Sequence, residues 1–493
     1  MVETKKIALV QPPSRARTPR PPLGLMYISS CLTKEGFENF IIDIKGKEPM
    51  QVIQDRILDI LNDKSIDIIG ITCLVTEIEI VEDMCVQIKK MKPDSIVVLG
   101  GAHPTNHPDH FIGAKACIDY FVIGEGEITF TELVKAIRLH TKNKMEIQKT
   151  NGIAWFEGNE IKRSPRRELI KNLDSLPFPA YDKIDMNYYT RPTSWGSRPI
   201  LFSLFWIFSS RGCPFRCKFC IAYEIFGKTV RQRSPKNVAD EIEYLVNTYN
   251  IDGIFFYDDT FTIGSKRIIA LCDEILKRKI RIIFGCQTRV NLIHENAIKK
   301  MAEAGCIQID FGIESGSEKI LKLIQKDITV KQVKRAVAIC KKYGIRILAN
   351  MMVNLPEETY EDLDASIKLM KEVNCNVVLW NVTVPYPGCF LQKELMREDY
   401  RNLMGFPSDE AFELLETKYK FAKYDIHLKD LIDKLYHIFP HPRYIHLKLK
   451  PDYLKRWFLF VDFIFKIKYI LAFLRSKRKL SYLKSIVCQT RRK

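Results

Sequence analysis

The sequence predicts an α/β protein with two successive domains and a helical C-terminal region. Short apolar runs alternate with segments of helical periodicity over residues 6–139, and the same alternation returns over residues 205–415. Continuous apolar runs between helices are typical of parallel strands whose sheet is covered on both faces. The chain has 493 residues, which is enough for two or three domains. We divide it into 1–144, a linker at 145–196, 197–415 and 416–493.

The first domain is expected to open on a strand and to continue with alternating helices and strands. Its strands are predicted at 6–10, 39–44, 66–73, 95–100 and 118–124. Two of its helices are predicted at 23–35 and 125–139. Ligands of parallel sheets bind at the carboxyl ends of the strands, so binding residues are expected directly after each strand.

The linker has a different composition from the domains on either side. Residues 153–163 predict a β-hairpin that turns at Glu157-Gly158-Asn159-Glu160. Residues 173–182 (LDSLPFPAYD) are rich in proline and are expected to be extended.

The second domain repeats the alternation of strand and helix six times. Its strands are predicted at 206–210, 253–258, 281–287, 306–313, 345–353 and 377–384. Its helices are predicted to begin near Pro235, Ser265, His294, Ser317, Thr329 and Tyr360. Six consecutive βα units indicate a partial or closed parallel barrel, with its chemistry at the carboxyl ends of the strands.

Cysteine usage and charge narrow the class of protein. The chain has 14 cysteines, and its opening residues (MVETKKIALVQPP) hold an apolar run too short for an export signal. We therefore expect reduced thiols and a cytoplasmic location, with most cysteines acting as small buried apolar side chains. The formal net charge is +18, which points to nucleic acid, an anionic membrane surface or a phosphate-rich cofactor.

Three cysteines stand together directly after the first strand of the second domain. Residues 210–220 (SRGCPFRCKFC) place Cys213, Cys217 and Cys220 at the spacing C-x3-C-x2-C. Thiolates are soft ligands that suit iron–sulfur clusters and zinc. A structural zinc site needs four ligands, and the next cysteine along the chain is the distant Cys272. Three ligands leave one position open, which is what a cluster that binds a substrate or cofactor needs.

The cysteine triplet resembles that of the radical S-adenosylmethionine (SAM) enzymes. This resemblance implies that Cys213, Cys217 and Cys220 hold a 4Fe-4S cluster whose open iron binds the amino and carboxylate groups of SAM. In that family one-electron reduction cleaves SAM to methionine and a 5′-deoxyadenosyl radical. The family's fold is a partial (β/α)6 barrel of TIM type, which agrees with the six predicted units.

The resemblance implies further SAM-binding residues at the strand ends. Phe219 would lie beside the adenine. Asp258 and Asp259 would receive the methionine amine, although both are also candidates for helix-capping residues. Glu314 and Ser315 would face the ribose or the carboxylate of SAM.

Other residues at the strand ends leave their roles open. Arg289 is interpreted either as the partner of a carboxylate or as a surface charge. Asn354 and Glu357 stand where the family more often has the glycines of Gly-x-Pro-Gly-Glu-Thr, which puts a close backbone approach to SAM in doubt. Cys389 is interpreted as an incidental thiol rather than a catalytic one. No catalytic residue is predicted.

The first domain is similar to the Rossmann-like cobalamin-binding domain of one radical SAM subclass. The shared segments are PPLGL, GGAHPT, GEGE, LPFPA and the cysteine triplet, in this order over about residues 1–400. Glycines at strand ends let the backbone approach a ligand closely. The resemblance implies cobalamin contacts from Gly100, Gly101, His103, Thr105, Gly124 and Glu125. The alternative is a domain that binds nothing and only docks on the barrel.

The cobalt ligand is a point of departure from other cobalamin proteins. The Asp-x-His-x-x-Gly loop that supplies a histidine to cobalt is absent, and Asp109-His110 does not match it. We expect His103 to be part of the loop structure and cobalt to have no protein histidine on its lower face.

The C-terminal tail carries most of the excess charge. Residues 463–493 contain ten Lys and Arg and no Asp or Glu, beside the aromatic run 457–465. A spanning helix needs about 20 apolar residues, and Asp462, Lys466 and Lys468 interrupt this one. The composition favours an interfacial helix with a basic end, on the inner face of the membrane. The alternatives are a helix packed on the barrel and nucleic-acid binding, which lacks a recognised module.

The sequence thus predicts a cobalamin-dependent radical SAM enzyme that methylates an unactivated carbon. Its expected cofactors are a 4Fe-4S cluster, SAM and cobalamin. Its expected partners are a hydrophobic small-molecule substrate, such as a lipid or tetrapyrrole, and an electron donor such as ferredoxin or flavodoxin. One alternative is oxidative cyclisation without methyl transfer, as in the anaerobic magnesium-protoporphyrin monomethyl ester cyclase. A second is a non-catalytic protein that binds or senses cobalamin or iron–sulfur.

Overall fold

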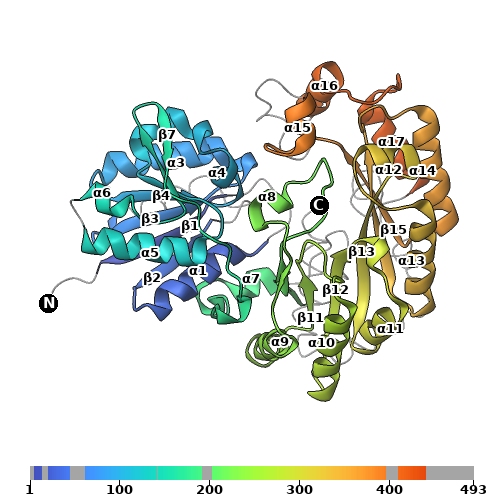
Figure 1. The fold of residues 1–493 in the computed structure, drawn as a ribbon, viewed down its shortest axis with the longest axis horizontal. Coiled ribbons are helices and arrows are strands. Elements are labelled where there is room, and N and C mark those ends of the chain that lie inside the picture. The colour runs from blue at the N-terminus through green and yellow to red at the C-terminus, as the bar shows by residue number, and fades with distance from the viewer. Residues whose placement is uncertain are drawn as a thin grey trace, which may run out of the picture. The chain divides into compact units, whose positions relative to one another are not determined.

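The computed structural model describes residues 5–13, 20–44, 62–140, 143–190, 203–395 and 409–439, which fall into two compact units (Figure 1). Unit 1 comprises Met1–Met186, Cys220–Arg231 and Pro385–Phe406. Unit 2 comprises Asn187–Phe219, Gln232–Val384 and Pro407–Lys493.

Unit 1 is built on one seven-stranded sheet in the order β2-β1-β3-β4-β5-β6-β7. The strands pair in parallel from β2 to β5, and β6 and β7 continue the sheet in antiparallel pairing. The strands are β1 (Lys6–Gln11), β2 (Asn39–Asp43), β3 (Ile66–Thr72), β4 (Ile96–Gly100), β5 (Tyr120–Val122), β6 (Ile153–Glu157) and β7 (Glu160–Arg163). The helical segments of unit 1 up to α8 are α1 (Leu23–Lys34), η1 (Val75–Glu77), α3 (Ile78–Met91), α4 (Ala102–Asn106), η2 (Pro108–Cys117), α5 (Gly126–Leu139), α6 (Lys144–Ile147), η3 (Leu173–Ser175), η4 (Tyr181–Lys183) and α8 (Ala222–Phe226). The short helix α7 (Met186–Thr190) begins at the last residue of this part of unit 1, and its other residues belong to unit 2.

Each face of this sheet carries its own apolar core, because alternate residues of a strand point to opposite faces. Ile7 and Leu9 of β1 pack with α1 and α5, whereas Ala8 and Val10 pack with α3 and η2. Figure 1 shows α1 and α5 on one face of the sheet and α3 on the other. Burial on both faces explains why the strands read as continuous apolar runs.

Unit 2 is built on a six-stranded sheet in the order β15-β14-β13-β12-β11-β8, and all of its pairs are parallel. The strands are β8 (Leu204–Ile207), β11 (Gly253–Phe256), β12 (Ile283–Thr288), β13 (Cys306–Glu314), β14 (Arg346–Val353) and β15 (Val377–Val382). Two short strands, β9 (Ser210–Arg211) and β10 (Arg231–Gln232), lie outside this sheet. The strand order follows the chain order and leaves β8 and β15 as edges, so the sheet is a partial barrel.

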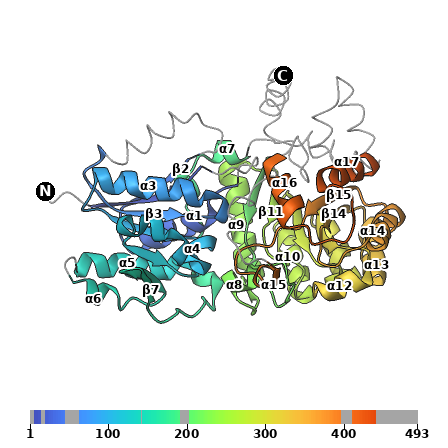
Figure 2. The ribbon, with the colours of Figure 1, turned by 90° about the horizontal axis from the view of Figure 1, so that it is seen from above.

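Helices cover the outer side of the partial barrel (Figure 1). They are α9 (Pro235–Tyr249), α10 (Ser265–Lys277), η5 (Val290–Leu292), α11 (Glu295–Glu303), α12 (Glu318–Leu323), α13 (Val330–Lys342) and α14 (Tyr360–Val373). The later helical segments are α15 (Phe390–Leu395) in unit 1, and α16 (Asp409–Lys418) and α17 (Leu428–Ile438) in unit 2. Figure 2 shows α17 beside β15, where the Tyr436 hydroxyl donates to Trp380 O at 3.0 Å.

The predicted strand–helix order is confirmed in both units, with two differences. The strand expected at 118–124 is limited to Tyr120–Val122, because Gly124 turns the chain with a φ of +85°. The hairpin expected at 153–163 forms, but it adds two strands to the sheet of unit 1. No helix in the described ranges is long and apolar enough to cross a membrane, and the predicted interfacial tail lies outside those ranges.

Candidate active site

The three clustered cysteines follow β8 and β9 on a single loop. Cys213 and Cys217 belong to unit 2, and Cys220 opens the segment of the chain that belongs to unit 1. None of the three forms a disulfide within the described residues; Cys217 is buried, and the other two are partly exposed. The donor set is therefore three thiols at C-x3-C-x2-C spacing without a disulfide, which fits an iron–sulfur cluster with one open iron position.

Each of these thiols has a polar neighbour. Cys213 Sγ lies 3.8 Å from Thr260 Oγ1, and Cys220 Sγ accepts from Ala222 N at 3.4 Å. Cys217 Sγ accepts from Arg289 Nη1 at 3.1 Å. Burial raises the pKa of the Cys213 thiol, partly opposed by hydrogen bonds from Phe215 N and Thr260. Donors of this kind stabilise a thiolate, the form that binds metal.

Most of the described cysteines outside the loop are buried core side chains, as expected. Cys73, Cys272, Cys286 and Cys340 are fully buried, and burial raises the pKa of each thiol well above its ordinary value. Cys389 is likewise buried, and burial again raises its pKa. Thiols held in the neutral form are poor ligands, so these residues need no role beyond packing.

The two neighbouring aspartates after β11 have different environments. Asp258 is fully buried and accepts from Ser209 N at 2.7 Å and from the hydroxyls of Ser209 and Ser210. Burial and the charge of Asp258 raise the pKa of Asp259 to about 6, while a hydrogen bond from Gly212 N acts in the opposite direction. The helix that follows, α10, has Gly264 at its N-cap, so neither aspartate caps it.

The predicted SAM residues after β13 are tied into the barrel. Glu314 pairs with Lys326 at 2.8 Å, and both side chains are buried. Ser315 is fully buried, and its hydroxyl accepts from Ser317 N at 3.1 Å. Phe219 packs against Ile320, Ile324 and Leu355, and the Lys326 ammonium lies 5.6 Å from its ring centroid. Glu314, Lys326 and Phe219 are therefore close together within unit 2.

The loop after β14 keeps the backbone conformation that glycine favours at Asn354 and Glu357. These are the two positions where the family more often has glycine. Asn354 has a φ of +62° and Glu357 a φ of +60°. Left-handed backbone is costly for most residues and less so for asparagine. The Asn354 side chain accepts from Phe421 N at 2.8 Å and donates to Tyr419 O at 2.9 Å. The asparagine thus fastens the loop after β14 to the segment that follows α16.

In unit 1, the predicted cobalamin residues form a connected loop structure. Thr105 Oγ1 donates to Gly101 O at 2.8 Å and accepts from Gly124 N at 3.1 Å. Gly101 has a φ of +97°, and a Cβ there would lie 2.6 Å from Thr72 Oγ1, so only glycine fits. Gly124 has no such crowding, since a Cβ there would meet no heavy atom within 4 Å. His103 is buried, and its backbone N donates to Cys73 O at 3.2 Å.

Glu125 lies in a buried ion pair. Its carboxylate accepts from Arg231 Nη1 at 2.8 Å on both oxygens and from Ile170 N at 2.8 Å. Arg231 also donates to Ile170 O and Phe226 O, both at 2.9 Å. This pair fastens the segment after Cys220 to the sheet of unit 1, a relation that the sequence did not predict.

A cavity of about 360 Å³ lies within unit 1, near Thr105, and polar and apolar groups share its lining. Its lining residues are Thr105, Asn106, His107, Ile123, Gly152, Ile153, Arg163, Ser164, Arg166, Glu224, Gly388 and Lys393. His107 Nε2 is a buried ring nitrogen without a hydrogen-bond partner among the described residues. A ligand with amide or phosphate groups would supply that partner, so the buried His107 Nε2 and the polar side chains in the mixed lining fit part of a cobalamin.

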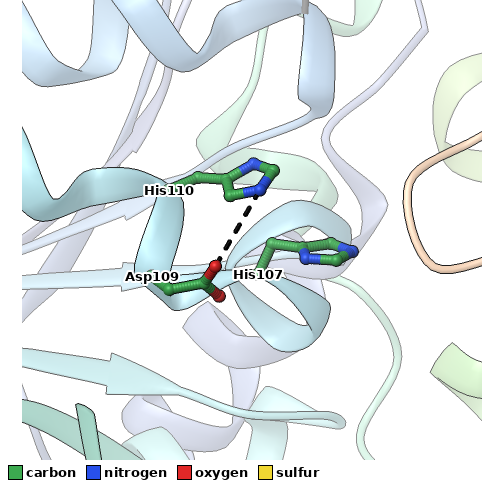
Figure 3. Close-up of side chains that lie close together, drawn as sticks. All are labelled: His107, Asp109 and His110. Carbon is green, nitrogen blue, oxygen red and sulfur yellow. Dashed lines mark ion pairs between the residues drawn. The ribbon is translucent and has the colours of Figure 1, made fainter. Parts of the chain in front are cut away.

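His107 is a residue that sequence reasoning missed, although it stands two positions after Thr105. It lies beside Asp109 and His110, and the nearest ligand atoms of the three are within 4.8 Å of one another (Figure 3). Burial and the neighbouring His110 lower the pKa of the His107 imidazole, which favours the neutral ring. Asp109 is largely exposed and forms an ion pair with His110 at 3.9 Å.

Comparison with known proteins gives both units a family. Residues 15–134 match the B12 binding domain, and residues 207–370 match the radical SAM superfamily. An uncharacterized methyltransferase of Pyrococcus horikoshii is 35% identical over 393 residues, which is 78% of this chain and 82% of that protein. The anaerobic magnesium-protoporphyrin IX monomethyl ester cyclase of Rubrivivax gelatinosus is 29% identical over 76% of this chain and 66% of that protein.

A solved structure has the same architecture. It is that of the radical S-adenosylmethionine methyltransferase TsrM from Kitasatospora setae, with cobalamin and a [4Fe-4S] cluster bound. The TM-score is 0.67 at 20% identity, and the match covers 80% of this chain and 78% of that one. The fold predicted from the sequence is therefore confirmed. The chain belongs to the cobalamin-dependent enzymes of the radical SAM superfamily, and its cofactors are a 4Fe-4S cluster, SAM and cobalamin.

Proposed function

We propose that this enzyme transfers a methyl group from SAM to an unactivated carbon of a small, hydrophobic substrate. The observation that carries the proposal is the 35% identity, over 78% of the chain, to a protein named as a methyltransferase. At 393 residues, that match is longer than either the B12-binding region or the radical SAM region alone. Bound to these residues, the three cofactors supply a carbon radical and a methyl carrier.

The cluster is assigned to Cys213, Cys217 and Cys220, which supply three thiolates from one loop. In the same proposal Asp259 accepts from the SAM ammonium, because the oxygens of Asp258 already accept from Ser209 and Ser210. Phe219 and Ser315 complete the SAM site, and Lys326 holds the Glu314 carboxylate in place. A buried, paired carboxylate is held in one geometry, which suits it to orient a ligand.

Cobalamin is assigned to unit 1. Gly100, Gly101, His103, Thr105, Gly124 and Glu125 are proposed to form the loops around it. Of these, Thr105 lines the cavity of unit 1, and Gly101 and Glu125 hold the loops through the contacts described above. His107 joins this set, because its Nε2 is buried without a partner among the described residues.

Methyl-labelled SAM tests the proposal. The full chain is reconstituted anaerobically with iron, sulfide and cobalamin, reduced with dithionite, and offered isoprenoid lipids and tetrapyrroles. Labelled product together with 5′-deoxyadenosine supports methyl transfer. The matched variants are Cys213→Ala, which removes a proposed cluster ligand, and Cys31→Ala, which removes a cysteine of α1 outside the loop. Only the first is expected to abolish product.

Oxidative cyclisation is the second candidate, favoured by the identity to the magnesium-protoporphyrin monomethyl ester cyclase. The same incubation separates the two reactions. A product without label, formed together with 5′-deoxyadenosine, would replace methyl transfer with cyclisation or another rearrangement.

We also propose that the basic tail, residues 463–493, binds an anionic membrane surface and that a ferredoxin or flavodoxin supplies the electron. The tail has ten Lys and Arg and no acidic residue, which favours anionic lipid headgroups. Sedimentation with anionic and neutral liposomes compares the full chain with one truncated after Leu454. Equal partitioning of the two chains would remove the membrane part of the proposal.

A further inference from the structure

Arg289 places a positive charge against a cysteine of the loop. It follows β12 and is 5% exposed. Its Nη1 donates to Cys217 Sγ at 3.1 Å, and its Nη2 donates to Lys326 O. The guanidinium carbon also stacks on Phe215, 3.8 Å from the ring centroid. Three contacts therefore hold one face and two nitrogens of this side chain.

This charge has no acidic partner within the described part of the chain. Among the described residues, no carboxylate forms an ion pair with Arg289, and its remaining contact is with Asn291 Oδ1 at 3.4 Å. The nearby buried cation, Lys326, is neutralised by Glu314 at 2.8 Å. An unpaired buried charge is costly, because it loses its hydration without gaining a counter-charge. The arrangement therefore needs an anion at the position of the Cys217 sulfur.

A cluster thiolate is such an anion. Phe215 lies between Cys213 and Cys217 in the chain, so the guanidinium both stacks on the loop and donates to one of its sulfurs. Hydrogen bonds to the sulfurs and the surrounding charge set the potential of an iron–sulfur cluster. Reduction adds one negative charge, and a fixed cation beside the sulfur stabilises that reduced state more than the oxidised one.

We propose that Arg289 is a positioning residue for the cluster. Its charged hydrogen bond to Cys217 raises the reduction potential of the cluster. The inference rests on the proposed ligand set and adds a residue that neither resemblance nor comparison assigns. Its function is to bring the one-electron reduction of the cluster within reach of the electron donor. This role does not require Arg289 to pair with a carboxylate, which was one of the two interpretations from the sequence.

The test measures the midpoint reduction potential of the cluster in the full chain without SAM. The chain is titrated with dithionite, and electron paramagnetic resonance monitors the reduced cluster. Arg289→Gln removes the charge, and Arg289→Lys keeps it. The matched control is Arg346→Gln, at the start of β14, where the arginine donates to Gln308 Oε1 at 3.0 Å. Iron content per chain and far-ultraviolet circular dichroism are measured on all variants.

We expect Arg289→Gln to lower the ratio of reduced to oxidised cluster about tenfold at a fixed potential, a shift of about 59 mV for one electron. Arg289→Lys should recover most of this shift, and Arg346→Gln should leave the potential unchanged. A wild-type potential in Arg289→Gln with full iron content would overturn the proposal. Loss of the cluster from both Arg289→Gln and Arg289→Lys, with the chain still folded, would also overturn the proposal, because lysine keeps the charge.

The ligand set itself is checked separately by Cys217→Ala. If that variant retains the full iron content and the wild-type spectrum, the proposed ligands are wrong, whatever the Arg289 variants do. Methyl transfer can also fail while the Arg289 result holds, because the potential is measured without SAM or substrate.

Discussion

Arg231 donates hydrogen bonds from Nη1 to both carboxylate oxygens of Glu125, each at 2.8 Å, although the two residues stand 106 positions apart. Both side chains are nearly inaccessible, with exposed fractions of 6% and 5%. The pair joins the loop after β5 to the segment that begins at Cys220. Removing one partner would leave the other charge buried without compensation.

We therefore predict that Glu125→Ala lowers the free energy of unfolding of the chain by about 3 kcal/mol. Urea unfolding followed by circular dichroism measures it. The matched control is Glu35→Ala, which removes the partner of Lys135 from an exposed pair. The control should unfold at nearly the wild-type midpoint, since exposed pairs are screened by solvent. Equal losses in the two variants would contradict a structural role for the buried pair.

The affinity for SAM should depend on the protonation of Asp259. Burial and the charge of Asp258 raise the pKa of Asp259 to about 6, so its carboxylate becomes protonated as the pH falls through that value. A protonated carboxyl cannot pair with the ammonium of SAM. Equilibrium dialysis on the reconstituted enzyme should give a constant Kd above about pH 7 and weaker binding below about pH 6. The same profile in Asp259→Asn would show that another group titrates.

Because the backbone at Asn354 is left-handed, we predict that the glycine variant at this position is more stable than the alanine variant. Both Asn354→Gly and Asn354→Ala lose the hydrogen bonds to Tyr419 and Phe421. Alanine is also strained at a φ of +62°, whereas glycine is not. The alanine variant should therefore unfold about 1 kcal/mol more easily than the glycine variant. At most positions the order is the reverse, because glycine has more freedom in the unfolded chain. Thermal unfolding of both variants measures the difference.

Glu358 should make the stability of unit 2 fall with rising pH. Burial is the main cause that raises the pKa of Glu358 to about 7, and hydrogen bonds from Leu355 N and Tyr424 act in the opposite direction. A carboxyl with a raised pKa in the folded state stabilises the fold below its ordinary pKa, and this contribution is lost as the pH rises from that value through about 7. Relative to Glu358→Gln, the wild type should lose about 1 kcal/mol of unfolding free energy between about pH 6 and pH 8. A parallel pH dependence in the two chains would contradict this assignment.

The order of elements could be predicted from the sequence because both sheets are buried on two faces. Ile7 and Leu9 face one core and Ala8 and Val10 the other, so the strand is apolar throughout and its limits are easily read. Periodicity within a segment does not indicate its pairing partner. For that reason the hairpin of β6 and β7 could be foreseen, but not its position at the edge of the first sheet.

A candidate site could be proposed from the sequence where its chemistry lies in neighbouring residues. Cys213, Cys217 and Cys220 can be recognised from their spacing alone. The contacts of Arg289 and Glu125 join residues that are 72 and 106 positions apart, and no local pattern indicates such pairs.

Helix capping by Asp258 or Asp259 was a reasonable alternative from the sequence, because aspartate is a common N-cap residue. In the structure α10 begins only at Ser265, and Gly264 occupies its N-cap. The two aspartates therefore lie in the loop before the helix. The residue types alone do not show at which residue the helix begins.

The cleavage of SAM by a cluster on the three-cysteine loop is the central claim, and 5′-deoxyadenosine is its direct product. The reconstituted chain is reduced with dithionite in the presence of SAM, and the nucleoside is quantified by mass spectrometry beside Cys213→Ala, Cys217→Ala, Cys220→Ala and the control Cys31→Ala. We predict 5′-deoxyadenosine from the wild type and the control, and none from the three loop variants. A wild-type chain with a complete, reducible cluster that forms no 5′-deoxyadenosine would contradict the claim.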